Sequence, residues 1–330
     1  MAQSKGTRSL KSCLLWLLGA LALMVVILVI AGLVFETTST ASAQELYPPS
    51  GQMIEVGDYL LHLNVMGENQ GLPAVILEHG GGSMSAQWGW VQTEIARYTQ
   101  VVAYDRPGLG WSESSPDPSN AEQVVNHLRL ALQEAGIPGP YVLVGHSMGG
   151  LLVRVYAALY PEEVVGLVLV DPRDVEWGNI YQPEELESGK NMIRLLTYLS
   201  RIGLVRISGA AAQDLQGLPP DYYEEALGIY SSYQHWDGIL ADAEVGDSAA
   251  EFLRRGENLE EVPLIVLSAS EPDGAFDARQ REIFLEQHAQ IASLSAQGRH
   301  RIVNGAGHVT IVTHQEHASA ISQAIFDLLE

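Results

Sequence analysis

The sequence predicts an α/β protein in which a mostly parallel central sheet carries helices on both faces, with a helical cap insertion and an N-terminal transmembrane helix. Three features lead to this prediction. Short apolar runs alternate with helical segments, a long acidic stretch interrupts the alternation, and an uncharged apolar run stands near the N-terminus. The 330 residues, 47% of them hydrophobic, can fill one large core together with an insertion.

The predicted strands are short apolar runs rich in β-forming residues. The first two flank Gly57 and Asp58, a turn signal that predicts a hairpin. The later runs are almost continuously apolar, which is typical of parallel strands buried on both faces. The expected strands occupy residues 53–56, 59–66, 74–78, 101–104, 141–144, 164–170, 264–267 and 301–303, and the expected helices residues 84–98, 120–135, 148–160, 277–296 and 315–329. These elements define a core of residues 51–172 and 263–330.

Residues 173–262 break the alternation. The stretch is acidic, helix-prone and rich in tryptophan and tyrosine. A structureless loop of this length is implausible in a compact domain. We therefore expect a helical cap seated over the sheet, with most of its aromatic side chains in the core of the cap itself.

Residues 13–35 form an uncharged, mostly apolar run. As a helix the run would be about 34 Å long, against about 30 Å for the hydrocarbon core of a bilayer. Three cations precede it and one acid follows, so we expect a membrane anchor with a cytoplasmic N-terminus and an extracytoplasmic domain; these residues are Lys5, Arg8, Lys11 and Glu36. A secreted protein is the alternative, because Ala41-Ser42-Ala43 resembles a signal cleavage site. The polar residues 36–50 are expected to form a linker.

Charge and cysteine content argue against other classes of protein. The formal net charge is −22, and so acidic a surface repels the phosphates of nucleic acids. Cys13 is the single cysteine, which leaves no internal disulfide and no cysteine-based metal site. The sequence contains no metal-ligand constellation or cofactor motif, so we expect neither group.

The segment Gly145-His146-Ser147-Met148-Gly149 matches the pattern G-x-S-x-G. It follows an apolar strand and precedes a helical run, the setting in which this motif exposes a serine nucleophile. The flanking glycines keep side chains out of a tight turn. We expect the hydroxyl of Ser147 at the carboxyl edge of the sheet, where open α/β sheets bind ligands.

Together with its neighbours, this motif resembles the α/β-hydrolase superfamily, in its serine esterase and lipase branch, over about residues 50–330. Residues 77–82 (LEHGGG), 104–112 (YDRPGLGWS) and 169–172 (LVDP) resemble further segments of that family in the same order. The resemblance implies Ser147 as nucleophile and His308, which follows the last strand in Gly305-Ala306-Gly307-His308, as its base. It also implies an oxyanion hole made of the backbone N–H groups of Gly81 and Met148.

The acid that orients His308 is harder to place. In most of the family it follows the seventh strand, where Asp273 fits, although one residue later than the usual pattern. A shift by one residue favours Glu271 or Asp277 instead. Asp171, after the sixth strand, holds the position that some lipases use. We predict Asp273, and we expect Asp105 and Arg106 to form a structural pair in their own loop.

A serine at position 147 argues against the haloalkane dehalogenase and epoxide hydrolase branches, whose nucleophile is a carboxylate. We expect a hydrolase that cleaves a carboxylic ester or related acyl bond of a small, hydrophobic substrate through an acyl-enzyme. A peptidase or a carbon–carbon hydrolase would use the same triad. A non-catalytic ligand-binding protein on the same fold is the other alternative.

Overall fold

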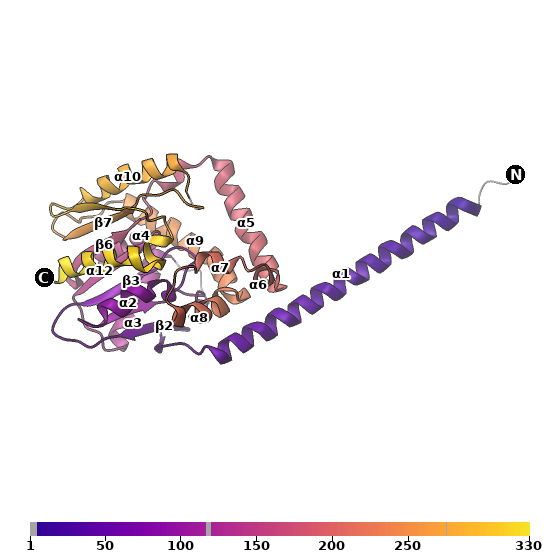
Figure 1. Ribbon diagram of the computed structural model, residues 1–330, viewed down its shortest axis with the longest axis horizontal. Coiled ribbons are helices and arrows are strands. Elements are labelled where there is room, and N and C mark those ends of the chain that lie inside the picture. Colours follow the sequence, from indigo (N-terminus) through magenta and orange to yellow (C-terminus); the bar gives the residue numbers. More distant parts are fainter. Residues whose placement is uncertain (1–4, 117–119, 275) are drawn as a thin grey trace.

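The computed structural model describes residues 5–116, 120–274 and 276–330. At its centre lies one eight-stranded sheet with the order β1-β2-β4-β3-β5-β6-β7-β8 (Figure 1). Strand β2 pairs antiparallel with β1 and β4, and the remaining pairings are parallel. The strands are β1 (Gln52–Glu55), β2 (Leu60–Met66), β3 (Ala74–Glu78), β4 (Val101–Tyr104), β5 (Tyr141–His146), β6 (Val164–Val170), β7 (Leu264–Ala269) and β8 (Arg299–Val303).

Helices cover both faces of the sheet, as predicted. Successive strand residues point to opposite faces, so Ile76 belongs to one buried cluster and its neighbours Val75 and Leu77 to the other. The first cluster includes side chains of α3 (Ala121–Glu134), α4 (Gly149–Leu159) and α10 (Ala278–Ala292). The second includes side chains of η1 (Ser85–Trp88), α2 (Gly89–Ile95), α11 (Thr310–Thr313) and α12 (Gln315–Leu329).

The segment between β6 and β7 forms a helical cap, also as predicted. Its helices are η3 (Trp177–Ile180), α5 (Pro183–Arg201), α6 (Leu204–Ser208), α7 (Ala211–Asp214), α8 (Pro220–Tyr230) and α9 (Tyr233–Arg254), and a short turn of helix, η2 (Pro161–Glu163), precedes β6. The cap has a buried cluster of its own, which takes in Met84 and Ala86 from the core. Helix α9 also packs against α3 and α4. The cap is therefore joined to the sheet layer by apolar contacts as well as by its two connections.

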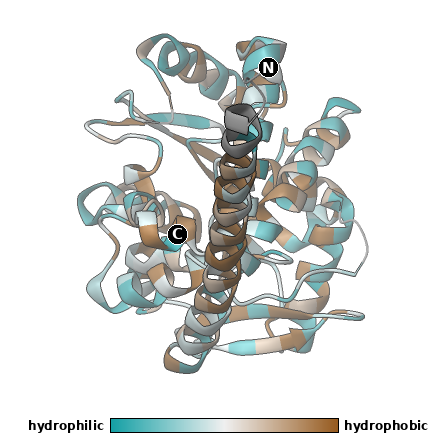
Figure 2. Ribbon diagram, turned by 90° about the vertical axis from the view of Figure 1, so that its right-hand side faces the viewer, coloured by the Kyte–Doolittle hydropathy of each residue, from teal (hydrophilic) through white to brown (hydrophobic). Residues whose placement is uncertain are grey.

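Helix α1 (Lys5–Leu46) projects away from the rest of the molecule (Figures 1 and 2). In the described part of the chain it alone is long and apolar enough to cross a membrane, judged by length and composition. The linker predicted for residues 36–50 is wrong as far as Leu46, because the helix continues to that residue. Its polar side chains have partners in the cap: the buried Glu36 forms an ion pair with Arg206 at 2.9 Å, and Gln44 donates to Gln234 at 2.8 Å.

Candidate active site

Ser147 stands in a strained turn between β5 and α4. Its φ of 52° lies in the left-handed region that side chains rarely adopt. The turn is closed so tightly that a Cβ on Gly145 would lie 2.5 Å from the carbonyl oxygen of Gly149, and a Cβ on Gly149 would lie 2.5 Å from that of Glu78. The backbone N–H of Ser147 donates to the carbonyl of Val170 at 3.0 Å, which ties the turn to β6.

His308 lies beside this serine, as its position in the sequence predicts. It sits in the loop between β8 and α11, and its Nε2 is 3.0 Å from Oγ of Ser147. The ring is mostly shielded, with 13% of the side chain exposed. The structure therefore brings the predicted nucleophile and the predicted base into hydrogen-bond contact, 161 residues apart in the chain.

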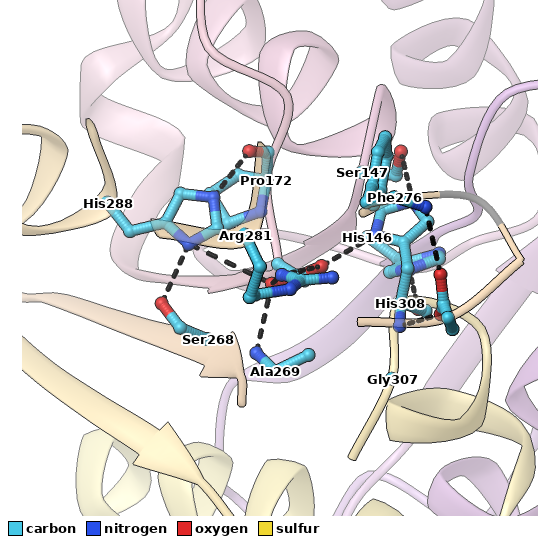
Figure 3. Close-up of polar contacts among 12 residues, drawn as sticks. His146, Ser147, Pro172, Ser268, Ala269, Phe276, Arg281, His288, Gly307 and His308 are labelled. Atoms are coloured by element: carbon cyan, nitrogen blue, oxygen red, sulfur yellow. Dashed lines mark hydrogen bonds and ion pairs between the residues drawn. The ribbon is translucent and has the colours of Figure 1, made fainter. Parts of the chain in front are cut away.

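The carboxylate at the other side of the His308 ring belongs to Asp171. Its Oδ2 is 2.6 Å from Nδ1 of His308. The same carboxylate accepts a hydrogen bond from the backbone N–H of Ala269 at 2.9 Å and both oxygens accept from Nη1 of Arg281, at 2.7 and 2.9 Å (Figure 3). Asp171 is buried and has a φ of 43°, so it too occupies a strained turn, at the end of β6.

The prediction that Asp273 contacts the imidazole of His308 is wrong. The carboxylate of Asp273 instead accepts from the backbone N–H of His308 and, at 3.2 Å, from that of Phe276. It therefore braces the loop that carries the histidine. The two carboxylates differ in their partners: that of Asp273 is bound to backbone N–H groups, whereas Oδ2 of Asp171 faces Nδ1 of the ring.

Burial and neighbouring charges shift the pKa values of Asp171 and His146. Burial alone would raise the pKa of Asp171, but the hydrogen bond with His308 and the charge of Arg281 help to hold that pKa well below its usual range. At His146, burial itself and the neighbouring His308 lower the pKa of the ring to about 3. The neutral ring of His146 donates from Nε2 to the carbonyl of His308 at 2.9 Å and accepts at Nδ1 from Gln87 at 2.6 Å.

The loop Gly80–Gly82 runs along the other side of Ser147. Arg106 donates to the backbone carbonyls of His79 and Gly80 at 2.7 and 2.8 Å. From the cap, Asp242 accepts from the N–H of Gly82 at 2.7 Å. Among the described residues no hydrogen bond is assigned to the backbone N–H groups of Gly81 and Met148. Gly81 lines a cavity beside Ser147.

Arg106 is the centre of a buried ionic network that the sequence analysis missed. It pairs with Glu78 at the end of β3 and, at 2.6 Å, with Asp242 of α9. The pair predicted between Asp105 and Arg106 is wrong, because Asp105 is bound to His62 at 2.8 Å instead. Adjacent strand ends could have indicated the contact of Glu78 with Arg106. Nothing in the sequence indicates Asp242, which lies 136 residues from its partner.

Two cavities meet at Ser147 and His308. The smaller has about 190 Å³ of empty space, and its other lining residues are Asp171, Pro172, Arg173, Trp177, Phe276 and Phe284. The larger has about 640 Å³ and is lined by Gly80, Gly81, Ser83, Gln87, His146, Asp214, Leu215, Leu218, Tyr230, Val309 and Thr313. Both combine apolar walls with a few polar groups next to the serine. This composition suits a mostly apolar ligand with one polar group at its centre.

One group of side chains in the described ranges has the spacing of metal ligands. His314, Glu316 and His317, at the start of α12, place one ligand atom each within 4.8 Å of the others. Groups of this kind are common on acidic surfaces without any ion. None of the three lines either cavity at Ser147. This group is therefore separate from the site at Ser147.

Residues 75–324 match the alpha/beta hydrolase family. The chain belongs to this family. An uncharacterized protein of Schizosaccharomyces pombe is 29% identical over 227 residues, which are 66% of this chain and 39% of that protein. The chain spans less than half the length of the curated relatives that it matches first.

Solved structures agree with this fold. A thermophilic esterase from Thermogutta terrifontis has a TM-score of 0.59 and 22% identity, covering 84% of this chain and 98% of that one. A putative epoxide hydrolase from Pseudomonas aeruginosa has a TM-score of 0.63 and 18% identity, covering 84% of this chain and 97% of that one. At these identities the likeness concerns the fold, which serves several kinds of hydrolysis.

Proposed function

We propose that this protein is a serine hydrolase that cleaves a carboxylic ester through an acyl-enzyme. The observation that carries the proposal is the unbroken series of hydrogen bonds from Asp171 through His308 to Ser147, at 2.6 and 3.0 Å, beside a cavity with about 640 Å³ of empty space. A neutral serine needs a base to take its proton, and a base of this kind needs a group that holds its tautomer. An epoxide hydrolase would require a carboxylate where this chain has Ser147.

The first half of the proposed reaction forms the acyl-enzyme. Oγ of Ser147 attacks the ester carbonyl carbon while its proton moves to Nε2 of His308. The carbonyl oxygen becomes an oxyanion. When the tetrahedral intermediate collapses, the bond from carbon to the leaving oxygen breaks, and the leaving alcohol takes the proton from Nε2. Asp171 stabilises the imidazolium throughout and stays ionised, in keeping with its low pKa.

The second half regenerates the serine. A water molecule gives its proton to Nε2 of His308 and attacks the acyl carbon. Collapse breaks the bond to Oγ, releases the carboxylic acid and returns the proton to Ser147. In both halves the backbone N–H groups of Gly81 and Met148 would donate to the oxyanion, a contact whose loss typically costs about 10²–10³ in rate. Their freedom from other acceptors in the described residues supports this role.

A fluorophosphonate probe tests the proposal directly. The probe should label the full chain, and Ser147→Ala should abolish both the label and the hydrolysis of p-nitrophenyl esters, by at least about 10³-fold. Ser83→Ala is the matched control and should keep the label, because Ser83 lines the same cavity and, among the described residues, no hydrogen bond joins its hydroxyl to a histidine. Equal labelling of the Ser147→Ala variant and the parent would refute the assignment and favour a binding protein.

We also infer that residues 13–35 anchor the protein in a membrane, with the N-terminus on the cytoplasmic side and the cap and sheet on the other. The apolar character of α1 and the positions of its flanking charges support this arrangement. Cleavage after Ala43 would remove Glu36, the partner of the part-buried Arg206. An anchored protein should stay with membranes through a high-salt wash. Soluble, unprocessed full-length protein would refute the anchor, and an N-terminus at Gln44 would indicate cleavage.

A further inference from the structure

Helices α5 and α6 of the cap expose a cluster of large apolar side chains. We call this cluster the α5–α6 face; its exposed fractions are 55% for Met192, 49% for Leu195, 69% for Tyr198, 45% for Leu204 and 66% for Ile207. The three on α5 follow one another at intervals of three residues, so they lie along one side of the helix. Contiguous exposed apolar surface of this kind usually marks a contact with a partner or a membrane.

The α5–α6 face lies where α1 leaves the cap. Gly32 packs so closely on Ile202 that a Cβ there would lie 2.6 Å from its carbonyl oxygen, and Gly203 packs against Phe35 in the same way. In Figure 1, α5 runs across the direction of α1, on the side of the molecule from which α1 projects. A membrane crossed by α1 would therefore have its surface close to α5 and α6.

The free length of α1 agrees with this placement. Below Gly32 the apolar residues 13–31 are exposed. As a helix these residues span about 28 Å, close to the thickness of about 30 Å of a bilayer hydrocarbon core. If they fill the bilayer, no length of helix is left over to hold the cap away from the lipid. The contacts at Gly32 and Glu36 thus determine how close the cap lies to the bilayer.

The charge around the face favours anionic lipid. Residues 188–213 contain four cations and no acid, in a chain with a net charge of −22; the cations are Lys190, Arg194, Arg201 and Arg206. Arg206 is paired with the buried Glu36. Lys190 and Arg201 are paired with Asp247 and Asp237 of α9 at 3.8 and 3.1 Å, but both keep about half of their side chains exposed. Long basic side chains at such a border can reach lipid headgroups while their stems cover apolar surface. Anionic leaflets attract basic segments of this kind.

We propose that the α5–α6 face lies on the surface of an anionic bilayer beside α1, with Tyr198 and Ile207 inserted at the level of the headgroups. The proposal rests on the anchor inferred under the proposed function. It makes the cap an interfacial element, comparable with amphipathic helices that lie in the plane of a membrane. The chain continues from α6 through α7 to Leu215 and Leu218, which line the larger cavity at Ser147.

The test uses the full chain in vesicles of phosphatidylcholine with a minor share of phosphatidylglycerol. Cys13→Ser removes the one native cysteine, and single cysteines are then introduced by Tyr198→Cys or Ile207→Cys and labelled with an environment-sensitive fluorophore. Spin-labelled lipid quenches a fluorophore that touches the bilayer. Ile302→Cys is the matched control, since Ile302 is 51% exposed on the edge strand β8. Val26→Cys reports on the anchor itself.

We expect labels at positions 198 and 207 to be quenched several-fold more than a label at 302, and less so in vesicles of phosphatidylcholine alone. If the label at position 26 is quenched but the labels at 198 and 207 are quenched no more than the label at 302, the cap does not dock on the bilayer, although α1 is still an anchor. Absence of quenching at 26 would overturn the anchor and this inference with it. Equal quenching in both kinds of vesicle would overturn the part assigned to anionic lipid.

Discussion

The two sides of Ser147 are built in different ways. On the acid side, Asp171 is held by Ala269 and Arg281, which come from β7 and α10 of the core. On the side of the proposed oxyanion hole, the loop Gly80–Gly82 is held by Arg106 from the core and by Asp242 from the cap. The core alone therefore supplies these contacts of Asp171, whereas the cap also binds the loop that we propose receives the oxyanion.

The pKa values of the buried carboxylates on the two sides are shifted in opposite directions. Hydrogen bonds and positive charge outweigh burial at Asp171 and lower its pKa. At Glu78, beneath the oxyanion loop, burial dominates over the attraction of Arg106 and raises the pKa to about 7. Asp242, a second carboxylate that pairs with Arg106, adds a smaller contribution that also raises the pKa of Glu78. Substitutions on the two sides are therefore expected to have different effects on activity and stability.

The largest expected effect comes from Asp171→Asn. The amide preserves size but removes the charge that stabilises the imidazolium of His308, so kcat should fall by about 10³–10⁴ near neutral pH. Steady-state kinetics on an activated ester measure this loss, and fluorophosphonate labelling should slow in parallel. A decrease of less than tenfold would remove Asp171 from the proposed mechanism.

Asp242→Asn should have the next largest effect. It leaves the buried Arg106 with one carboxylate fewer, and breaking a buried pair typically costs about 3–5 kcal/mol of stability. The amide offers one acceptor oxygen in place of the two that bind Arg106 and the N–H of Gly82, so the loop should be held less firmly. We expect kcat/KM to fall by about 10- to 100-fold, less than the loss of about 10²–10³ that follows removal of an oxyanion donor itself. Asp237→Asn is the control on the same helix. Its pair with Arg201 is at the surface and should contribute at most about 1 kcal/mol. Unchanged kinetics in Asp242→Asn would show that the cap does not shape the loop.

Asp273→Asn should have a smaller effect on catalysis. The amide oxygen can still accept from one of the backbone N–H groups that bind the carboxylate, so the loop of His308 should loosen while Asp171 still stabilises the imidazolium. We expect kcat to change by less than about tenfold, since one neutral hydrogen bond contributes about 1 kcal/mol. A crippled Asp273→Asn beside a nearly normal Asp171→Asn would restore Asp273 as the acid.

The smallest effect concerns pH and Glu78. Its pKa is higher in the folded chain, about 7, than in the unfolded chain, so its contribution to stability is present at low pH and is lost as the pH rises through 7. Glu78→Gln keeps the shape but cannot ionise, so its melting temperature should decline less between pH 5 and pH 8 than that of the parent. Thermal unfolding at a series of pH values in one detergent measures both. Parallel curves would mean that Glu78 stays ionised on folding.

The elements with local signals could be predicted from the amino-acid sequence. The strand–turn–helix around Ser147, the strands, the helical cap and the apolar run of α1 follow from periodicity, glycine spacing and hydropathy, which act over a few residues. His308 was predicted from the resemblance to the family and from its position after the last strand, and the structure places it next to Ser147. The loop Gly80–Gly82 was predicted from the same resemblance, which its glycines help to carry.

Contacts between residues that are far apart in the sequence could not be predicted in this way. Asp171 rather than Asp273 meets His308 because the carboxylate of Asp273 is bound to backbone N–H groups, whereas Oδ2 of Asp171 faces Nδ1 of the ring. Arg106 pairs with Asp242 rather than with its neighbour Asp105. A buried guanidinium needs several acceptors, and Asp242 of the cap supplies two oxygens. The polar residues after Phe35 stay helical because the cap satisfies Glu36. In each case the partner lies far away in the sequence, and local patterns carry no information about which distant groups folding brings together.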